Sequence, residues 1–185
     1  MFRRMNRRDA AEWASADTVP DLGQLMARWL SGDLKSWPGY QPNCRPDDET
    51  REILAALIRA NRRGYVTTCS QPGVDDPHCR YGHWRQRAAV QGHADRRTLG
   101  AIRTAAARNG LDVLVDSRRE IATTIDGRGH TDFGGRLRRR DMSAVWGGIA
   151  RTAHQALLDA HEIAIIHPDY GPAGTQPLIR TLNAI

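Results

Sequence analysis

Residues 65–73 read Tyr65-Val66-Thr67-Thr68-Cys69-Ser70-Gln71-Pro72-Gly73. The stretch begins with aromatic and β-branched residues and ends in a Pro-Gly turn, so it predicts a strand over residues 65–71. A core strand usually ends in apolar residues, but this one carries hydroxyl, thiol and amide groups from Thr67 to Gln71. Because ligands of sheet proteins often bind where polar groups gather at strand ends, this strand end is the first candidate binding site.

Helical and strand patterns alternate on both sides of this strand. Apolar stripes with capping residues predict two helices before it, over residues 20–30 and 49–63. After it we expect a polar loop, a strand, a helix, a strand, a hairpin, a long helix, a strand and a short helix, over residues 73–83, 84–93, 96–109, 111–116, 120–133, 143–159, 163–166 and 177–182. Because several strands are neighbours in sequence, the order favours an α+β fold with a mixed, mostly antiparallel sheet flanked by helices.

The length and the ends of the chain suggest one domain in a reducing compartment. A chain of 185 residues fits a single core, so we expect a basic arm or irregular lead-in over residues 1–16 and one α+β domain over residues 17–185. No apolar run approaches the ~20 residues of a membrane helix, and no apolar stretch follows the basic start as in a secretory signal. The three cysteines are too few and odd in number for a disulfide scaffold, so a cytoplasmic location is expected.

Several segments of the chain together resemble those of a known family. They are Asp21-Leu22-Gly23, Trp29-Leu30, Pro38-Gly39-Tyr40, Thr67-Thr68-Cys69-Ser70-Gln71-Pro72-Gly73, Gln86-Arg87-Ala88-Ala89-Val90-Gln91-Gly92 and His167-Pro168-Asp169-Tyr170-Gly171. The set resembles a family of uncharacterised actinobacterial proteins, a domain of unknown function. The resemblance implies one bacterial, intracellular domain and assigns no catalytic residue, so the chemistry has to be argued from the residues.

The strand end predicts a pocket for a polar or anionic small molecule. Its ligand-binding groups would be Thr67, Cys69, Ser70 and Gln71, with positive charge from Arg85 or Arg87. Whether the pocket is catalytic is left open. A nucleophilic Cys69 would need a lowered thiol pKa and an orienting partner, and the catalytic candidates at other predicted strand ends are His93, His167 and Asp169.

A metal site is a weaker hypothesis. Cys79 and His83 have a spacing seen in zinc ligands, and Cys44, Cys69 and His78 could complete a tetrahedral set. The sequence has no Cys-x-x-Cys hook, so structural zinc is not favoured as a cofactor.

Two other functions remain as alternatives. The formal charge is +6, and Lys35 is the only lysine among the 27 basic residues. Arginine clusters could bind the phosphates of a nucleic acid, and the candidates are Arg96, Arg97, Arg103, Arg138, Arg139 and Arg140. The abundance of arginine also fits the codon bias of a high-GC genome, so composition alone does not select this interpretation. A third interpretation is a structural or partner-binding domain without a small-molecule site.

Overall fold

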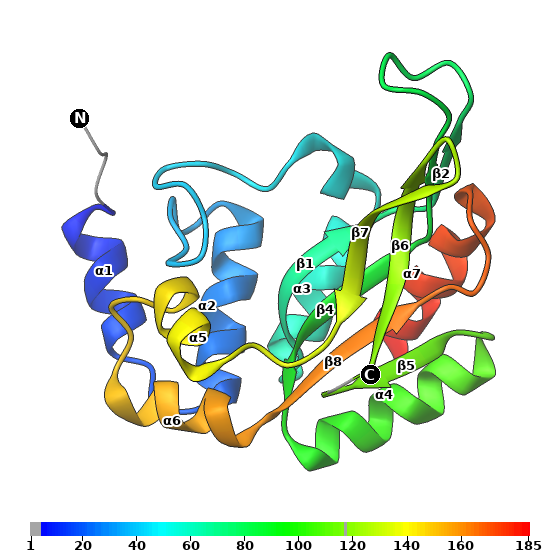
Figure 1. The fold of residues 1–185 in the computed structure, drawn as a ribbon. Coiled ribbons are helices and arrows are strands. Elements are labelled where there is room, and N and C mark those ends of the chain that lie inside the picture. The colour runs from blue at the N-terminus through cyan, green and yellow to red at the C-terminus, as the bar shows by residue number, and fades with distance from the viewer. Residues whose placement is uncertain (1–4, 117) are drawn as a thin grey trace.

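Two antiparallel four-stranded sheets form the centre of the protein (Figure 1). The structure is a computed structural model that describes residues 5–116 and 118–185. The first sheet has the strand order β1 (Val66–Gln71), β4 (Ala89–Ala94), β8 (His161–Ile166) and β5 (Asp112–Val115). The second has the order β2 (Val74–Asp76), β3 (Trp84–Gln86), β6 (Arg119–Ile125) and β7 (Arg128–Gly134). The α+β class is confirmed, with the strands divided between two sheets instead of sharing one mixed sheet.

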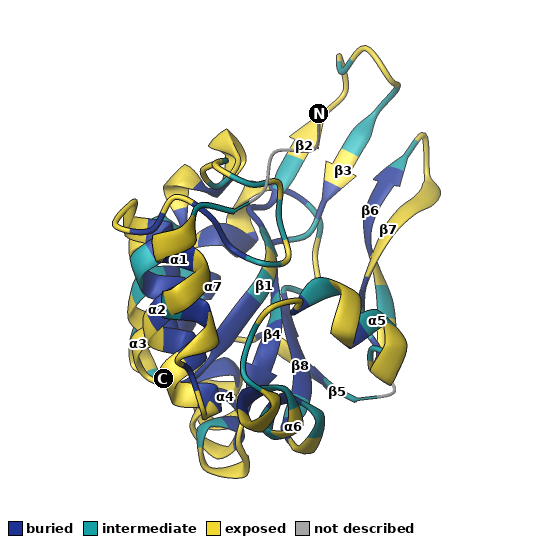
Figure 2. Cartoon of the chain, turned by 90° about the vertical axis from the view of Figure 1, so that its left-hand side faces the viewer, coloured by how far each residue is buried: buried dark blue, intermediate teal, exposed yellow. Residues whose placement is uncertain are grey.

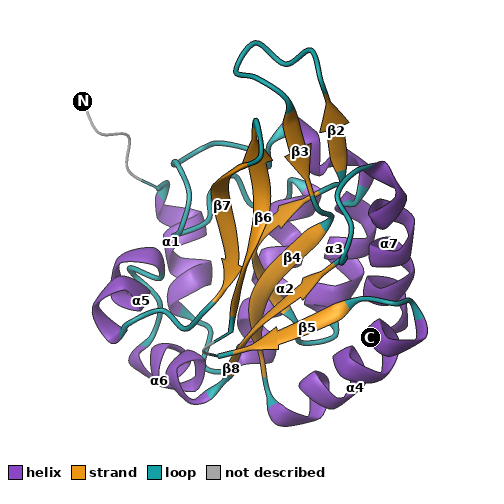
Figure 3. Ribbon diagram, turned by 45° about the vertical axis from the view of Figure 1, so that its right-hand side comes forward, coloured by secondary structure: helices purple, strands orange, loops and turns teal. Residues whose placement is uncertain are grey.

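Helices cover one face of the first sheet, and the second sheet packs on the other face (Figure 3). The longer helices are α1 (Arg7–Ala14), α2 (Val19–Ser31), α3 (Leu54–Arg62), α4 (Arg96–Arg108), α5 (Arg139–Val145), α6 (Arg151–Asp159) and α7 (Thr175–Ala184). Two short 3-10 turns are η1 (Asp48–Glu52) and η2 (Pro172–Gly174). Within the described residues, no helix has the length and apolar character needed to span a bilayer.

Strand β8 shows how the two faces of the first sheet are built. Successive side chains of a strand point to opposite faces. Ile163 and Ile165 accordingly belong to the large core under the helices, whereas Ala164 and Ile166 belong to a smaller core with Phe133 of β7. Buried positions dominate this central part of the molecule, while the tips of the second sheet project outward and are mostly exposed (Figure 2).

The N-terminal region differs from the expected irregular lead-in. Residues 7–14 form helix α1, whose Trp13 is fully buried and donates a hydrogen bond from Nε1 to the Ser36 carbonyl oxygen at 2.9 Å. The buried Asp9 carboxylate accepts hydrogen bonds from the backbone N–H groups of Lys35 and Ser36 at 2.8 and 2.9 Å. These long-range bonds fix the helix against the loop after α2. The part of the expectation that concerns residues 1–4 lies outside the described residues.

Three other predicted elements have different boundaries. The strand expected over residues 84–93 divides into β3 and β4, which belong to different sheets. The long helix expected over residues 143–159 divides into α5 and α6, because Gly148 adopts a φ of +89° that ends helical geometry. The loop expected over residues 73–83 includes the short strand β2. The boundaries of the remaining predicted helices and strands agree with the structure to within a few residues. The helix expected over residues 49–63 begins as the 3-10 turn η1 and continues as α3.

Candidate functional site

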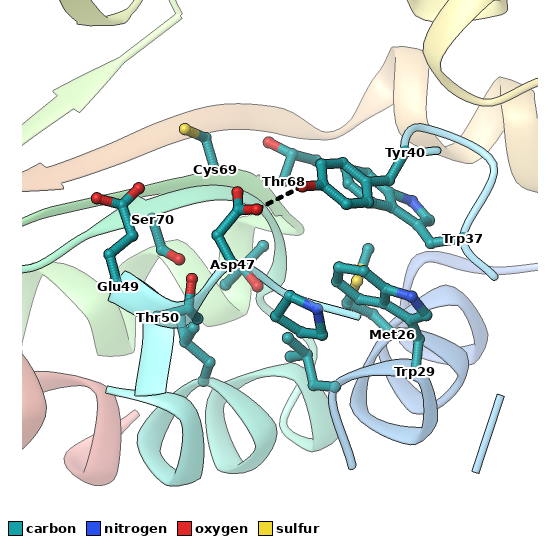
Figure 4. A pocket seen from close by; sticks show the side chains of 14 residues that line it. Met26, Trp29, Trp37, Tyr40, Asp47, Glu49, Thr50, Thr68, Cys69 and Ser70 are labelled. Carbon is teal, nitrogen blue, oxygen red and sulfur yellow. Dashed lines mark hydrogen bonds between the residues drawn. The ribbon is translucent and has the colours of Figure 1, made fainter. Parts of the chain in front are cut away.

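A pocket of about 180 Å³ lies between strand β1, helix α2 and the loop that leads into η1 (Figure 4). Strand β1 is one of the two edge strands of the first sheet, so its outer side faces this loop and not another strand. The volume is comparable to an engineered cavity of ~150 Å³ that accepts benzene, so the pocket suits a small ligand or a headgroup. The pocket is lined by Met26, Trp29, Leu30, Trp37, Tyr40, Pro46, Asp47, Glu49, Thr50, Leu57, Thr67, Thr68, Cys69 and Ser70.

Three aromatic rings form one wall of the pocket. The ring centroids of Trp29 and Trp37 are 5.4 Å apart, and the Tyr40 ring lies 5.9 Å from Trp29 in an edge-to-face arrangement. The rings are held in place, because Trp29 Nε1 donates to the Cys44 carbonyl oxygen at 3.1 Å and Trp37 packs against Trp146. The face of an aromatic ring carries partial negative charge and its edge partial positive charge.

Two carboxyl groups also line the pocket, Asp47 just before η1 and Glu49 within it. The Tyr40 hydroxyl donates a hydrogen bond to Asp47 Oδ1 at 2.6 Å, and this bond raises the pKa of Tyr40 to about 12. Tyr40 therefore remains a donor, and Asp47 is fixed beside the aromatic wall. Loss of water around the Glu49 carboxyl, together with the nearby Asp47 charge, raises the Glu49 pKa. The lining contains no arginine, lysine or histidine, so its formal charge is negative.

Strand β1 supplies the polar floor. Thr67, Thr68, Cys69 and Ser70 line the pocket, and three of them, Thr67, Cys69 and Ser70, are among the predicted ligand-binding residues. Asn61 of α3 fixes the strand, since its Nδ2 donates to Thr67 Oγ1 at 2.7 Å and its Oδ1 accepts from the Thr67 N–H at 3.0 Å. Both Asn61 and Thr67 are buried.

The other predicted ligand-binding residues lie elsewhere. A register shift between Thr67 and Cys69 interrupts the alternation of β1, and Gln71 points into the contact between the two sheets. Its Nε2 donates to the Arg87 carbonyl oxygen at 2.8 Å. Arg87 pairs with Glu120 at 3.0 Å, and both Arg85 and Arg87 stack on the Tyr170 ring. Neither arginine lines the pocket, so neither offers its charge to a ligand there.

The structure also separates the catalytic candidates. Cys69 is exposed at the sheet edge, and the loss of solvation by neighbouring atoms, followed by the nearby Glu49 carboxyl, raises its pKa, which disfavours the thiolate form needed by a nucleophile. His93 is 1% exposed beside Trp146, and burial lowers its pKa to about 4. The Asp169 N–H donates to His167 Nδ1 at 3.1 Å in a local turn. None of His93, His167 and Asp169 lines the pocket with Cys69.

The zinc candidates are not brought together. Among residues 5–116 and 118–185, no group of three or more His, Cys, Asp or Glu side chains has an arrangement that could hold a metal ion. Cys44 lies near Gln41, Cys69 lies on β1, and His83 contacts Asp75 through Nε2 at 2.5 Å.

The arginine candidates for nucleic acid fall into two separate groups. Arg96, Arg97 and Arg103 belong to α4, whereas Arg138 precedes α5 and Arg139 and Arg140 lie in its first turn. Helices α4 and α5 lie in different parts of the molecule in two views (Figures 1 and 3). The two groups therefore lie on separate helices.

The sequence did not predict the residues that give the pocket its chemical character. The predicted site residues did not include Trp37, Tyr40, Asp47 or Glu49. The available signal was the short distance in sequence between the aromatic residues of this loop and the acidic run Asp47-Asp48-Glu49. Only the fold brings that loop against the polar face of β1.

The fold and the pocket define an α+β protein with an acidic, aromatic-walled cavity at a sheet edge. The chain belongs to the family described as Domain of unknown function (DUF6919), whose family model matches residues 8–184. A comparison with curated proteins gives no match.

Proposed function

We propose that this protein binds a small organic ammonium ion in the pocket beside β1. The observation that carries the proposal is the combination of three aromatic rings with two carboxyl groups in a cavity lined by no basic residue. An ammonium group over aromatic faces is attracted by the ring quadrupoles, by ~0.5–2 kcal/mol depending on desolvation. Asp47 and Glu49 would neutralise its charge, and the apolar rings would bury its methyl or methylene groups.

The same lining argues against two other ligand classes. An anionic ligand would meet the Asp47 and Glu49 carboxylates with no compensating cation from the lining residues. A neutral apolar ligand would remove water from these two carboxylates without pairing them, which is unfavourable. Thr68 and Ser70 also line the pocket, and their hydroxyls can form hydrogen bonds with a polar group of the ligand.

The cysteines bear on two further parts of the proposal, the cellular location and the absence of covalent catalysis. The three cysteines, Cys44, Cys69 and Cys79, are all free thiols, which supports action in a reducing cytoplasm. The raised pKa of Cys69 favours a binding role over covalent catalysis at this site.

Isothermal titration with choline and with its uncharged isostere 3,3-dimethylbutan-1-ol tests the proposal. The two probes have nearly the same shape and differ in charge, so we expect choline to bind at least about tenfold more tightly, equivalent to ~1.4 kcal/mol. The double variant Asp47→Asn, Glu49→Gln should lose this preference. Asp48→Asn is the matched control, because Asp48 pairs with Arg51 outside the pocket lining. Equal binding of the two probes, or a preference unchanged in the double variant, would refute the proposal.

A further inference from the structure

A second hollow, of about 460 Å³, lies between helix α4 and the adjacent ends of β5 and β8. It is lined by Arg96, Leu99, Gly100, Arg103, Val115 and His161. None of these residues lines the aromatic pocket beside β1, so the hollow is a different site. We propose that it binds a small organic phosphate ester, with the phosphate held by Arg96, Arg103 and His161.

Two arginines of α4, Arg96 and Arg103, line this hollow because their spacing places them on one face of the helix. Positions 96, 100 and 103 are separated by four and three residues, so they share one face of the helix. Within the described part of the chain, neither Arg96 nor Arg103 forms an ion pair, so both guanidinium groups are free to meet an anion. A guanidinium group matches a phosphate with two parallel hydrogen bonds.

Gly100 leaves the floor between the two arginines open. A Cβ atom added there would meet nothing within 4 Å. Glycine in the interior of a helix costs ~1 kcal/mol relative to alanine, and no neighbouring group at this position requires it for packing. The open space lets an anion approach the helix surface between the side chains of Arg96 and Arg103.

His161 adds a third donor in its imidazolium form, in which Nδ1–H points to Asp116 and Nε2–H remains for a ligand. Its Nδ1 lies 3.1 Å from Asp116 Oδ2, so the ring presents the other nitrogen, Nε2, away from that carboxylate. Asp116 is itself held, because it accepts the Glu162 N–H at 3.1 Å and lies 3.7 Å from the Arg136 guanidinium. Asp116 has a φ of +55°, an uncommon conformation for a residue other than glycine, and it places the carboxylate behind His161.

The remaining walls suit the organic part of an ester. Leu99 is buried and Val115 half-buried, and both are apolar. The hollow is larger than a phosphate ion needs, since ligand sites for small organic molecules span ~300–1,000 Å³. The combination therefore favours a phosphate attached to a small organic group over the free ion.

Titration with phenyl phosphate, inorganic phosphate and a short single-stranded oligonucleotide tests the assignment. We expect phenyl phosphate to bind more tightly than inorganic phosphate, and Arg96→Gln or Arg103→Gln to weaken it roughly tenfold or more. Arg97→Gln is the matched control, because Arg97 lies on the same helix but outside the hollow. Gly100→Leu should fill the hollow and abolish binding while circular dichroism and the unfolding midpoint show an intact fold.

Three outcomes would overturn the assignment. The first is phenyl phosphate binding that Arg97→Gln weakens as much as Arg96→Gln does, and the second is equal affinity for phenyl phosphate and inorganic phosphate. The third is tight oligonucleotide binding with steep salt dependence and equal loss in all three arginine variants, which would indicate a general nucleic-acid surface. Choline binding in the Arg96→Gln variant should remain unchanged, so this test is independent of the proposal for the aromatic pocket.

Discussion

Glu49 illustrates how one side chain can control recognition in the aromatic pocket. Its pKa is raised by loss of solvation and by the Asp47 charge, so it becomes protonated at a higher pH than an ordinary glutamate. A bound cation favours the charged carboxylate, and a proton competes with that cation for the same group. The ionisation of Glu49 is therefore linked to ligand affinity.

We predict that choline affinity falls as the pH is lowered from about 7.5 to about 4.5. The fall attributable to Glu49 should be about two- to fivefold, the effect of one partly exposed ion pair. The Glu49→Gln variant should bind choline about two- to fivefold more weakly at neutral pH, and its affinity should lack the part of the pH dependence that Glu49 causes. Titration calorimetry at each pH, with circular dichroism to verify folding, measures the effect. An unchanged pH profile in Glu49→Gln would show that another group is responsible.

His93 gives a prediction about stability. In the folded protein its pKa is about 4, because burial beside Trp146 and the charge of Arg136 disfavour the imidazolium. Its two ring nitrogens have no hydrogen-bond partner among the described residues. The unfolded chain takes up a proton below a pH of about 6.5, while the native state stays neutral until about 4. Stability is therefore lost as the pH falls through this window.

We predict that the contribution of His93 to this loss reaches about 3 kcal/mol at the acid end of the window. Urea unfolding of the His93→Leu variant should lack that part of the pH dependence. His78→Gln, at an exposed position, serves as the control and should behave as the natural chain does. If the His93→Leu variant and the natural chain lose the same stability as the pH falls, the assignment of a buried, neutral His93 is wrong.

At the scale of elements, the contact between α3 and β1 positions the pocket floor. Asn61 is fully buried and bonds to both the hydroxyl and the N–H of Thr67. It also donates to the Leu57 carbonyl oxygen at 2.9 Å within its own helix. One amide therefore joins the last turn of α3 to the start of the edge strand.

We predict that Asn61→Ala lowers the free energy of unfolding by about 1–3 kcal/mol, since it leaves the buried Thr67 N–H without a partner. Choline affinity should fall as well, because β1 forms the pocket floor. Gln24→Ala removes an exposed hydrogen bond to the Arg62 carbonyl oxygen and should have a much smaller effect. Equal losses in the two variants would contradict the role given to Asn61.

Elements defined by local patterns were predicted well. Helix α2 has a capping box formed by Thr18 and Asp21, and its apolar stripe matches the buried face of the helix. The hairpin of β6 and β7 turns at Asp126-Gly127, as that dipeptide predicts. The division of residues 84–93 was not predicted, because the choice between two sheets depends on distant partners. Arg87 donates its N–H to Ala122, while Ala89 pairs with Ile166.

At the scale of the whole molecule, the second sheet is joined to the first through a shared core. Phe133 of β7 is 1% exposed and packs with Leu114, Ala164 and Ile166 of the first sheet. Gln91 of β4 accepts the Gly134 N–H at 2.8 Å, which adds a polar connection. These contacts predict that the two sheets unfold together.

We predict that Phe133→Ala lowers the free energy of unfolding by about 3–5 kcal/mol in a single transition. Tryptophan fluorescence mainly reports the first core, because four of the five tryptophans lie there. Its urea midpoint should fall together with that of the far-ultraviolet circular dichroism. Ile121→Ala, on the exposed side of the same hairpin, should change little. A fluorescence midpoint that stays constant in Phe133→Ala would show that the second sheet unfolds separately.

The polar face of β1 was visible in the sequence, but the sign of the pocket charge was not. Arg85 and Arg87 stack on Tyr170 and pair with Asp75 and Glu120, and neither lines the pocket. Asp47 and Glu49 reach the pocket because the loop before η1 folds over the sheet edge. That path depends on tertiary packing of Trp29 and Trp37, which no local pattern specifies.

Intermolecular nuclear Overhauser effects between the N-methyl protons of choline and the protein measure the central claim most directly. The account predicts contacts from these methyl groups to the rings of Trp29, Trp37 and Tyr40, with none to Trp84 on the second sheet. The contacts should disappear in the double variant Asp47→Asn, Glu49→Gln. Contacts to Trp84 alone, or contacts that persist in the double variant, would contradict an ammonium site in this pocket.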